Sequence, residues 1–225
     1  MHKKNVPNIL LLFTGGTITM IKNDAGVLVP ARKIEDITNT FALMKQIAQL
    51  ESELIADMDS SNMTPEIWHK LAQRIYANYH DYDGFVITHG TDTLAYTASA
   101  LSLALPNLHK PVILTGAQKP ISLLGSDSHF NLFNSVKVAA EGKVREVAIV
   151  FDTRILRGNR CSKKYAHKID AFWSPQFPMI CEVGIEIKYF SYLPPAHLAK
   201  RKLLLQDHFD PNIVSLSLFP GFAPP

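Results

Sequence analysis

The chain alternates short apolar runs with segments long enough to form a helix, and this alternation constrains its fold more than any other feature. The apolar runs span residues 8–13, 53–57, 84–88, 111–115 and 146–151. Such alternation is typical of βαβ units, in which neighbouring strands are parallel. We therefore predict an α/β fold with an open, mostly parallel, doubly wound sheet that is flanked by helices.

Three of the segments between these runs carry helix signals. Thr64 precedes Pro65, an arrangement that favours a helix start, and Ile67, Leu71 and Ile75 follow at four-residue spacing. This spacing places the apolar side chains on one face of an amphipathic helix. The other two predicted helices span residues 93–105 and 126–141.

The pattern changes after residue 151. Residues 152–174 are rich in Arg and Lys and lack a clear apolar periodicity, which predicts a long functional loop. The stretch 180–189 predicts a strand or hairpin, and 212–218 predicts one more strand. We therefore expect a catalytic domain over 1–190, a linker over 191–211, and over 212–225 the start of a second α/β domain that is cut short.

Composition excludes several classes of function. The chain has 225 residues, of which 47% are hydrophobic and 19% charged, as in a soluble globular protein. A formal charge of +3 does not indicate a nucleic-acid partner, and no apolar stretch approaches the ~20 residues needed to span a membrane. Two cysteines without CxxC spacing predict free thiols, and the histidines form no metal-ligand pair. We predict a cytoplasmic protein without metal or cofactor.

Glycine turns with hydroxyl groups follow the first and third apolar runs. Thr14 and Thr17 flank a Gly-Gly pair after the first run, and Thr91 and Asp92 follow Gly90 after the third. In an open α/β sheet, ligands bind beyond the carboxyl ends of the strands. Amide cleavage needs a nucleophile, a proton acceptor and donors for the developing oxyanion. Thr17 is a candidate nucleophile, although a plain strand-to-loop turn explains this fragment better when it is taken alone.

The segment that follows Gly90 also has two readings. Thr91 and Asp92 precede a predicted helix, where such residues commonly act as caps. A basic partner is available in the Lys163-Lys164 pair of the long loop, so that a Thr–Lys–Asp cluster would form a proton relay. The short polar side chains of 57–63 follow the second run and could hold the charged groups of an amino acid.

Several motifs in this order resemble the bacterial-type L-asparaginase family, especially its cytosolic branch. They read TGGTI, DSSNM, DGFVITHGTDT, PVILTGAQ and RGNRCSKK. The resemblance implies that Thr17 attacks the side-chain amide carbon of asparagine and that Thr91, Asp92 and Lys163 form the second catalytic group. It further implies a supporting role for the Thr14 hydroxyl. The implied substrate-binding residues are Asp59, Ser60, Ser61, Gly90 and Asp92.

The resemblance implies a reaction and an assembly. Asparagine and water would give aspartate and ammonia through a threonine acyl-enzyme, without a cofactor. The protein would form a homodimer or homotetramer if the second domain is present, and its activity would be reduced or absent without that domain. Family members commonly carry a tyrosine in the loop after the nucleophile, where Val27 stands here. We expect either another group in its place or a weakened proton relay.

Alternatives remain for both the lysine and the function. Lys164 would be the catalytic lysine if the match to the family pattern were shifted by one residue. Lys119 is another candidate, but it does not align with the lysine of the family pattern. The same threonines would also serve a glutaminase or amidotransferase-type relative. A non-catalytic amino-acid-binding module is the alternative from another class.

Overall fold

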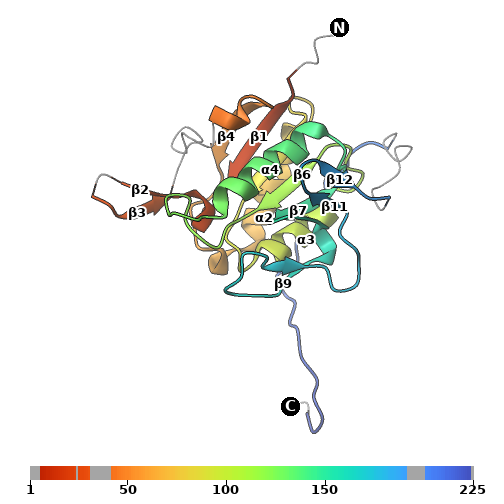
Figure 1. The fold of residues 1–225 in the computed structure, drawn as a ribbon. Helices are drawn as coiled ribbons and strands as arrows, with labels where there is room; N and C mark the ends of the chain where they lie inside the picture. Colours follow the sequence, from red (N-terminus) through yellow and green to blue (C-terminus); the bar gives the residue numbers. More distant parts are fainter. Residues whose placement is uncertain (1–5, 24, 31–41, 192–200, 224–225) are drawn as a thin grey trace.

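The computed structural model describes residues 6–23, 25–30, 42–191 and 201–223. Its main sheet has eight strands within these residues, in the order β12-β11-β8-β7-β6-β5-β1-β4 (Figure 1). The strands of this sheet are β1 (Asn8–Phe13), β4 (Gln49–Leu54), β5 (Gly84–Thr88), β6 (Val112–Thr115), β7 (Val147–Phe151), β8 (Arg154–Arg157), β11 (Cys181–Val183) and β12 (Ile187–Tyr189).

Five neighbouring strands of the sheet are parallel, which confirms the predicted fold class. β4, β1, β5, β6 and β7 pair in parallel, while β8, β11 and β12 add an antiparallel edge. The chain leaves β1 for β4 on one side and then crosses back to β5 on the other. Such a reversal of strand order opens a crevice at the carboxyl ends of the strands, where ligands of α/β proteins bind.

Helices cover both faces of the sheet. The helices α2 (Pro65–Ala77) and α3 (Leu94–Ala104) pack on one face, and α4 (Ser128–Glu141) packs on the other (Figure 1). The side chains of β1 alternate between the two cores, with Leu10 and Leu12 facing α2 and α3, and Leu11 facing α4. The parallel strands are buried on both faces, which explains why they appear in the sequence as continuous apolar runs.

The three predicted helices are confirmed with small shifts at their ends. α2 starts at Pro65 directly after Thr64, and its buried residues include Ile67, Leu71 and Ile75, as the spacing predicts. α4 starts two residues later than predicted, at Ser128. Because local hydrogen bonds set the first residue of a helix, the apolar periodicity alone locates that residue only to within one or two positions.

Three sequence predictions of secondary structure were wrong. The strand predicted over 53–57 lies at Gln49–Leu54, because β4 is a half-exposed edge strand whose polar outer positions break the apolar run. The predicted loop 152–174 contains β8, the 3₁₀ turn η4 (Gly158–Arg160) and a small hairpin of β9 (Ser162–Lys163) with β10 (Phe172–Trp173). Residues 212–218 form no strand, and no neighbouring strand pairs with them.

Two further segments complete the description. The strands β2 (Met20–Lys22) and β3 (Leu28–Pro30) form a hairpin that projects from the body (Figure 1). The predicted hairpin at 180–189 is confirmed as β11 and β12. Part of the predicted linker, 192–200, lies outside the described residues. No helix among the described residues is long and apolar enough to cross a membrane.

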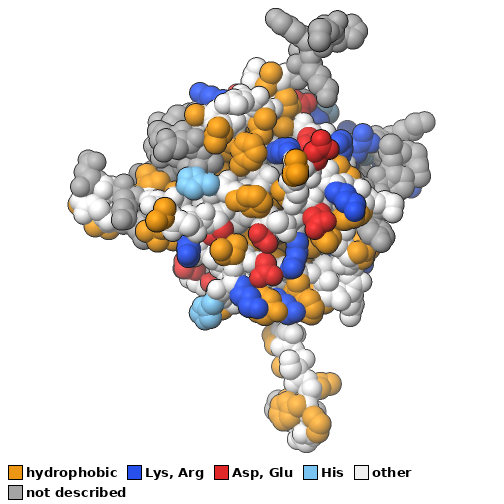
Figure 2. All heavy atoms as spheres, viewed as in Figure 1, with side chains coloured by type: hydrophobic (Ala, Val, Ile, Leu, Met, Phe, Trp, Pro, Cys, Tyr) orange, Lys and Arg blue, Asp and Glu red, His pale blue; other side chains and the backbone are white. Residues whose placement is uncertain are grey.

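The chain after residue 201 runs along α3 and α2 and then leaves the body. Leu203 is buried and Leu205 is half-buried on these helices, while Leu204 between them is exposed. Backbone bonds from Leu204 to the Pro106 carbonyl and from Gln206 to the Ala104 carbonyl fix its path. Farther on, apolar side chains are exposed on the projecting end in Figure 2; they include Ile213, Val214, Leu216, Leu218 and Phe219.

Candidate active site

Three loops meet at the carboxyl ends of β4, β1 and β5. The loop after β1 contains the 3₁₀ turn η1 (Thr17–Thr19), and the loop after β4 contains the 3₁₀ turn η3 (Ser60–Asn62). The loop after β5 leads into α3. A hydrogen bond from Thr93 Oγ1 to the Ser60 carbonyl, 2.6 Å long, joins the second loop to the third. The reversal of strand order at β1 therefore brings together segments that are far apart in the sequence.

Glycines allow these loops to approach one another closely. A Cβ on Gly16 would lie 2.5 Å from the Gly90 nitrogen, and a Cβ on Gly90 would lie 2.6 Å from Ser60 Oγ. Gly16 also has a φ of 86°, a conformation that side chains rarely permit. Both positions therefore require glycine for steric reasons, and at Gly16 the backbone conformation requires it as well.

A cavity of about 300 Å³ lies between the three loops. Six residues that the sequence predicts for the site line it: Thr17, Asp59, Ser60, Gly90, Thr91 and Asp92. The lining also includes Gly16, Met20, Asp57 and Met58. The cavity is large enough for a small polar molecule of amino-acid size, and its lining supplies hydroxyl and carboxylate groups for such a molecule.

Lys163 joins the two polar residues that follow Gly90. Its Nζ lies 2.8 Å from Thr91 Oγ1 and 2.7 Å from Asp92 Oδ1. The Lys163 side chain is only 19% exposed, whereas that of Asp92 is 64% exposed. Lys163 lies on β9, in the segment that the sequence predicts as a functional loop. It contacts Thr91 and Asp92 but does not itself line the cavity.

Thr14 occupies a different position from the other predicted residues. It is buried, and its Oγ1 donates to the Thr88 carbonyl over 2.8 Å. Its backbone N–H also bonds to this carbonyl. Thr14 does not line the cavity. Its observed contacts tie the ends of β1 and β5 together, which supports the position of Thr17 through the backbone.

The loop after β4 presents a carboxylate held by its own backbone. Asp59 caps η3, and its Oδ1 accepts bonds from Ser61 Oγ at 2.7 Å and from Ser61 N at 2.8 Å. Both bonds hold the pKa of Asp59 below its usual value, and the bond from the Ser61 side chain has the larger effect. Ser61 therefore acts on Asp59 and does not itself line the cavity, while Ser60 is buried directly beside Gly90.

Two contacts around the cavity were missed by sequence reasoning. Thr91 Oγ1 donates to Gln118 Oε1 over 3.4 Å, and Gln118 lies in the PVILTGAQ motif. His89 is fully buried and its Nδ1 lies 2.7 Å from the Gly90 carbonyl oxygen. Burial lowers the pKa of the His89 imidazole to about 4, so that the ring is neutral at pH 7. The only sequence signal for His89 is its place beside Gly90.

The rival lysines and Val27 lie elsewhere. Lys164 is exposed, with its Nζ 4.2 Å from the centre of the Trp173 ring. Lys119 bonds through its backbone to Asp127 and does not line the cavity. Val27 is 57% exposed in the turn between β2 and β3, and it also lies outside the cavity lining.

The cysteines do not offer a competing nucleophile. Cys161 and Cys181 are both free, and burial raises the pKa of each thiol to about 12. Thiols with such a pKa are protonated at pH 7 and are poor nucleophiles. Among the described residues no cluster of His, Cys, Asp or Glu could hold a metal ion.

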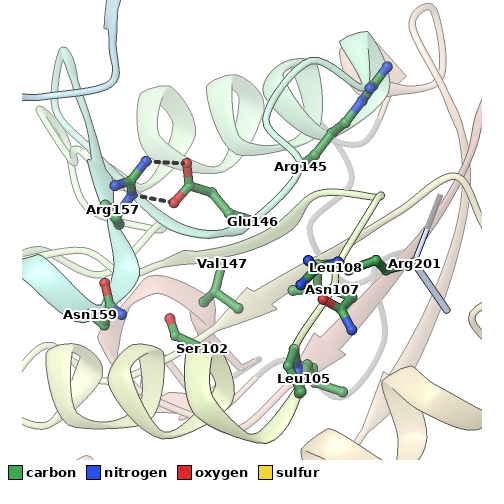
Figure 3. Close-up of a pocket in the computed structure, with 11 residues that line it drawn as sticks. Ser102, Leu105, Asn107, Leu108, Arg145, Glu146, Val147, Arg157, Asn159 and Arg201 are labelled. Atoms are coloured by element: carbon green, nitrogen blue, oxygen red, sulfur yellow. Dashed lines mark hydrogen bonds and ion pairs between the residues drawn. The ribbon is translucent and has the colours of Figure 1, made fainter. Parts of the chain in front are cut away.

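A second cavity, of about 330 Å³, lies near the amino end of β7, whereas the first cavity lies at the carboxyl ends of the strands (Figure 3). It is lined by the ion pair of Arg157 and Glu146, whose nearest atoms are 2.6 Å apart, and by Arg145. In Figure 3 the Arg145 side chain points away from this pair, so the arginines do not converge on one point. Ser102 is the one hydroxyl side chain in its lining, and its Oγ donates to the Ala98 carbonyl over 2.7 Å.

Comparison with known proteins defines the family. Residues 8–194 match the family model described as Asparaginase, N-terminal. The chain is 42% identical over 229 residues to L-asparaginase 1 of Escherichia coli strain K12, covering 99% of this chain and 66% of that protein. The chain therefore belongs to the asparaginase family.

Solved structures agree with this membership. The thermostable L-asparaginase from Thermococcus kodakarensis superposes with a TM-score of 0.84 at 34% identity, covering 96% of this chain and 65% of that one. L-asparaginase I from Vibrio cholerae gives a TM-score of 0.82 at 36% identity, covering 96% and 66%. The chain thus spans about two thirds of the length of the relatives that it matches.

Proposed function

We propose that this chain carries the active site of an L-asparagine amidohydrolase, which converts asparagine and water to aspartate and ammonia. The observation that carries the proposal is the contact of Lys163 with both Thr91 and Asp92 at the edge of the cavity that Thr17 lines. Two threonines and a cation beside one small polar cavity supply a nucleophile and a proton-transfer group. Family membership supports the same chemistry.

In the proposed first step, Thr17 Oγ attacks the side-chain amide carbon of asparagine. As the C–N bond breaks, the proton lost by the Thr17 hydroxyl passes to the leaving nitrogen, so that ammonia departs and a Thr17 ester remains. A water molecule then attacks the ester carbonyl and releases aspartate. Lys163 donates to Thr91 Oγ1 and stabilises negative charge on that oxygen, which makes this hydroxyl a better partner for proton transfer. No cofactor takes part in the proposed reaction.

The charges around the cavity suit the two ends of an amino acid. Asp92 and Asp59 offer carboxylates to the substrate's α-ammonium group, and the Ser60 hydroxyl offers a donor to its α-carboxylate. Because Gly90 has no side chain, Ser60 can pack directly against it, which brings the Ser60 hydroxyl beside the loop after β5. We therefore place substrate binding at Asp59, Ser60, Gly90 and Asp92, with Ser61 orienting Asp59.

The assembly and location follow from the same resemblance. The motifs of the cytosolic branch favour a cytoplasmic protein, and the second domain and the homodimer or homotetramer stay predictions. Asparagine is the proposed substrate, and glutamine is the competing one.

The test compares ammonia release from asparagine and from glutamine by the 225-residue chain, together with the shift in melting temperature that aspartate causes. Faster release from asparagine supports the proposal, and faster release from glutamine favours the glutaminase branch. A melting temperature raised by aspartate without any ammonia release would favour the binding module instead. Absence of both effects would contradict the proposed site.

A further inference from the structure

A line of hydrogen bonds runs from α2 through α3 to the loop after β5. Trp68 Nε1 lies 2.8 Å from Thr97 Oγ1, Thr97 Oγ1 lies 2.8 Å from His89 Nε2, and His89 Nδ1 lies 2.7 Å from the Gly90 carbonyl oxygen. Thr97 and His89 are fully buried. These three side chains lie beneath the loop that carries Thr91, and the proposed mechanism uses none of them.

The donor and acceptor properties of the three side chains allow these hydrogen bonds to point in only one direction. An indole N–H only donates, so Thr97 Oγ1 accepts from Trp68 and has its own proton available for His89 Nε2. His89 then carries its proton on Nδ1 and donates it to the Gly90 carbonyl. Each donor meets an acceptor, and each polar atom of the line is satisfied. The bonding pattern therefore selects one tautomer of His89.

The Gly90 carbonyl belongs to the same peptide unit as the Thr91 N–H. Since a peptide unit is planar and trans, a bond that fixes the carbonyl also fixes the direction of this N–H on the opposite side. Gly90 and Thr91 both line the cavity, and Thr91 Oγ1 receives the bond from Lys163. The orientation of His89 thus sets the backbone on which the Thr91 side chain is mounted.

The far end of the line contacts the chain segment 201–210. The rings of Phe209 and Trp68 meet edge to face, with their centres 5.6 Å apart. Next to Trp68 on α2, His69 Nδ1 lies 2.8 Å from Asp207 Oδ2. The segment 201–210 is therefore anchored on α2 at the residue from which the line of hydrogen bonds begins.

We propose that Trp68, Thr97 and His89 are positioning residues that couple the docking of segment 201–210 to the Gly90–Thr91 peptide of the active site. Phe209 holds the Trp68 ring, Trp68 and Thr97 orient the His89 ring, and His89 holds the peptide. Loosening the segment then changes the active-site loop without unfolding the domain. The effect on turnover rests on the proposed function, whereas the mechanical coupling does not.

The first test measures hydrogen exchange of the Trp68 indole N–H and the His89 Nδ1–H by NMR in the full chain and in F209A. We expect both protons to exchange faster in F209A, by about tenfold or more. F219A is the matched control, because Phe219 is 63% exposed on the projecting end. Trp173, which stands outside the line, serves as an internal reference. Unchanged exchange in F209A, or an equal change in F219A, would refute the coupling.

The second test uses activity and separates positioning from mere stability. T97V should lower kcat/KM by about tenfold, whereas T97S keeps the hydroxyl and should restore most of it. In a W68F background, which lacks the indole donor, F209A should cause little further loss of kcat. Fully additive losses of kcat from W68F and F209A would refute the coupling through Trp68. If the wild-type chain releases no ammonia, the proposed function fails, and the exchange measurements alone decide the coupling.

Discussion

Lys163 Nζ lies 2.8 Å from Thr91 Oγ1, although 72 positions separate the two residues in the chain. The contact forms because β9 lies beside the start of α3, where Ser162 and Lys163 line a small cavity together with Asp92 and Ala95. A cation at hydrogen-bond distance from a threonine hydroxyl, with Asp92 as its counter-ion, is the feature that distinguishes this edge of the sheet from an ordinary set of loops.

Replacing Lys163 tests its part in proton transfer. K163M removes the cation, and we expect kcat to fall by about 10²–10⁴-fold. K163R keeps the positive charge but does not lose a proton near neutral pH. Steady-state ammonia release from asparagine measures both. Near-normal activity of K163R would show that only the charge is needed, and near-normal activity of K163M would remove Lys163 from the mechanism.

Gly90 is predicted to tolerate no side chain. In G90A the new Cβ would lie 2.6 Å from Ser60 Oγ and 2.7 Å from Ser60 Cβ, so the two loops must separate. We expect a loss of about 1–3 kcal/mol in the free energy of unfolding, measured by urea denaturation. The matched variant S60G removes both clashing atoms. G90A/S60G should regain stability relative to G90A, and additive losses would contradict the steric account.

His89 predicts a pH dependence of stability. Its pKa is about 4 in the folded chain, because of burial, and near 6.5 in the unfolded chain. Between these values the unfolded state binds more protons, so stability rises with pH and is lost as pH falls from 6.5 to 4. The full contribution is about 3 kcal/mol. Urea denaturation from pH 4 to 7 measures it, and H89Q, which cannot take up this proton, should show a flatter profile than the wild type.

The sequence predicts the parallel core of the fold because buried strands and amphipathic helices leave a periodic signal. It misplaces β4 at the sheet edge, where polar outer residues hide the strand. It also misses β8, which pairs with β7 of the main sheet, and β9, which pairs with β10 in a separate two-stranded sheet. Short strands of this kind are stabilised by their tertiary partners and not by their own composition.

The candidate site also contains some residues that the sequence could predict and others that it could not. Residues that carry chemistry next to glycine turns, such as Thr17, Thr91 and Asp92, could be named from motifs, and they line one cavity. The buried position of Thr14 could not be named, because its hydroxyl bonds to the backbone of a strand 74 positions away. The contacts of His89 could not be named either, because its bond to Thr97 depends on how α3 packs beside the loop after β5.

In the proposed reaction Thr17 is the nucleophile, and every later step depends on the ester that it forms. The most direct measurement is ammonia release from asparagine by the full chain and by T17A, with circular dichroism and melting temperature as controls for folding. We expect T17A to stay folded and its ammonia release to fall by on the order of 10⁴-fold. Release by a folded T17A at the wild-type rate would contradict the assignment of Thr17.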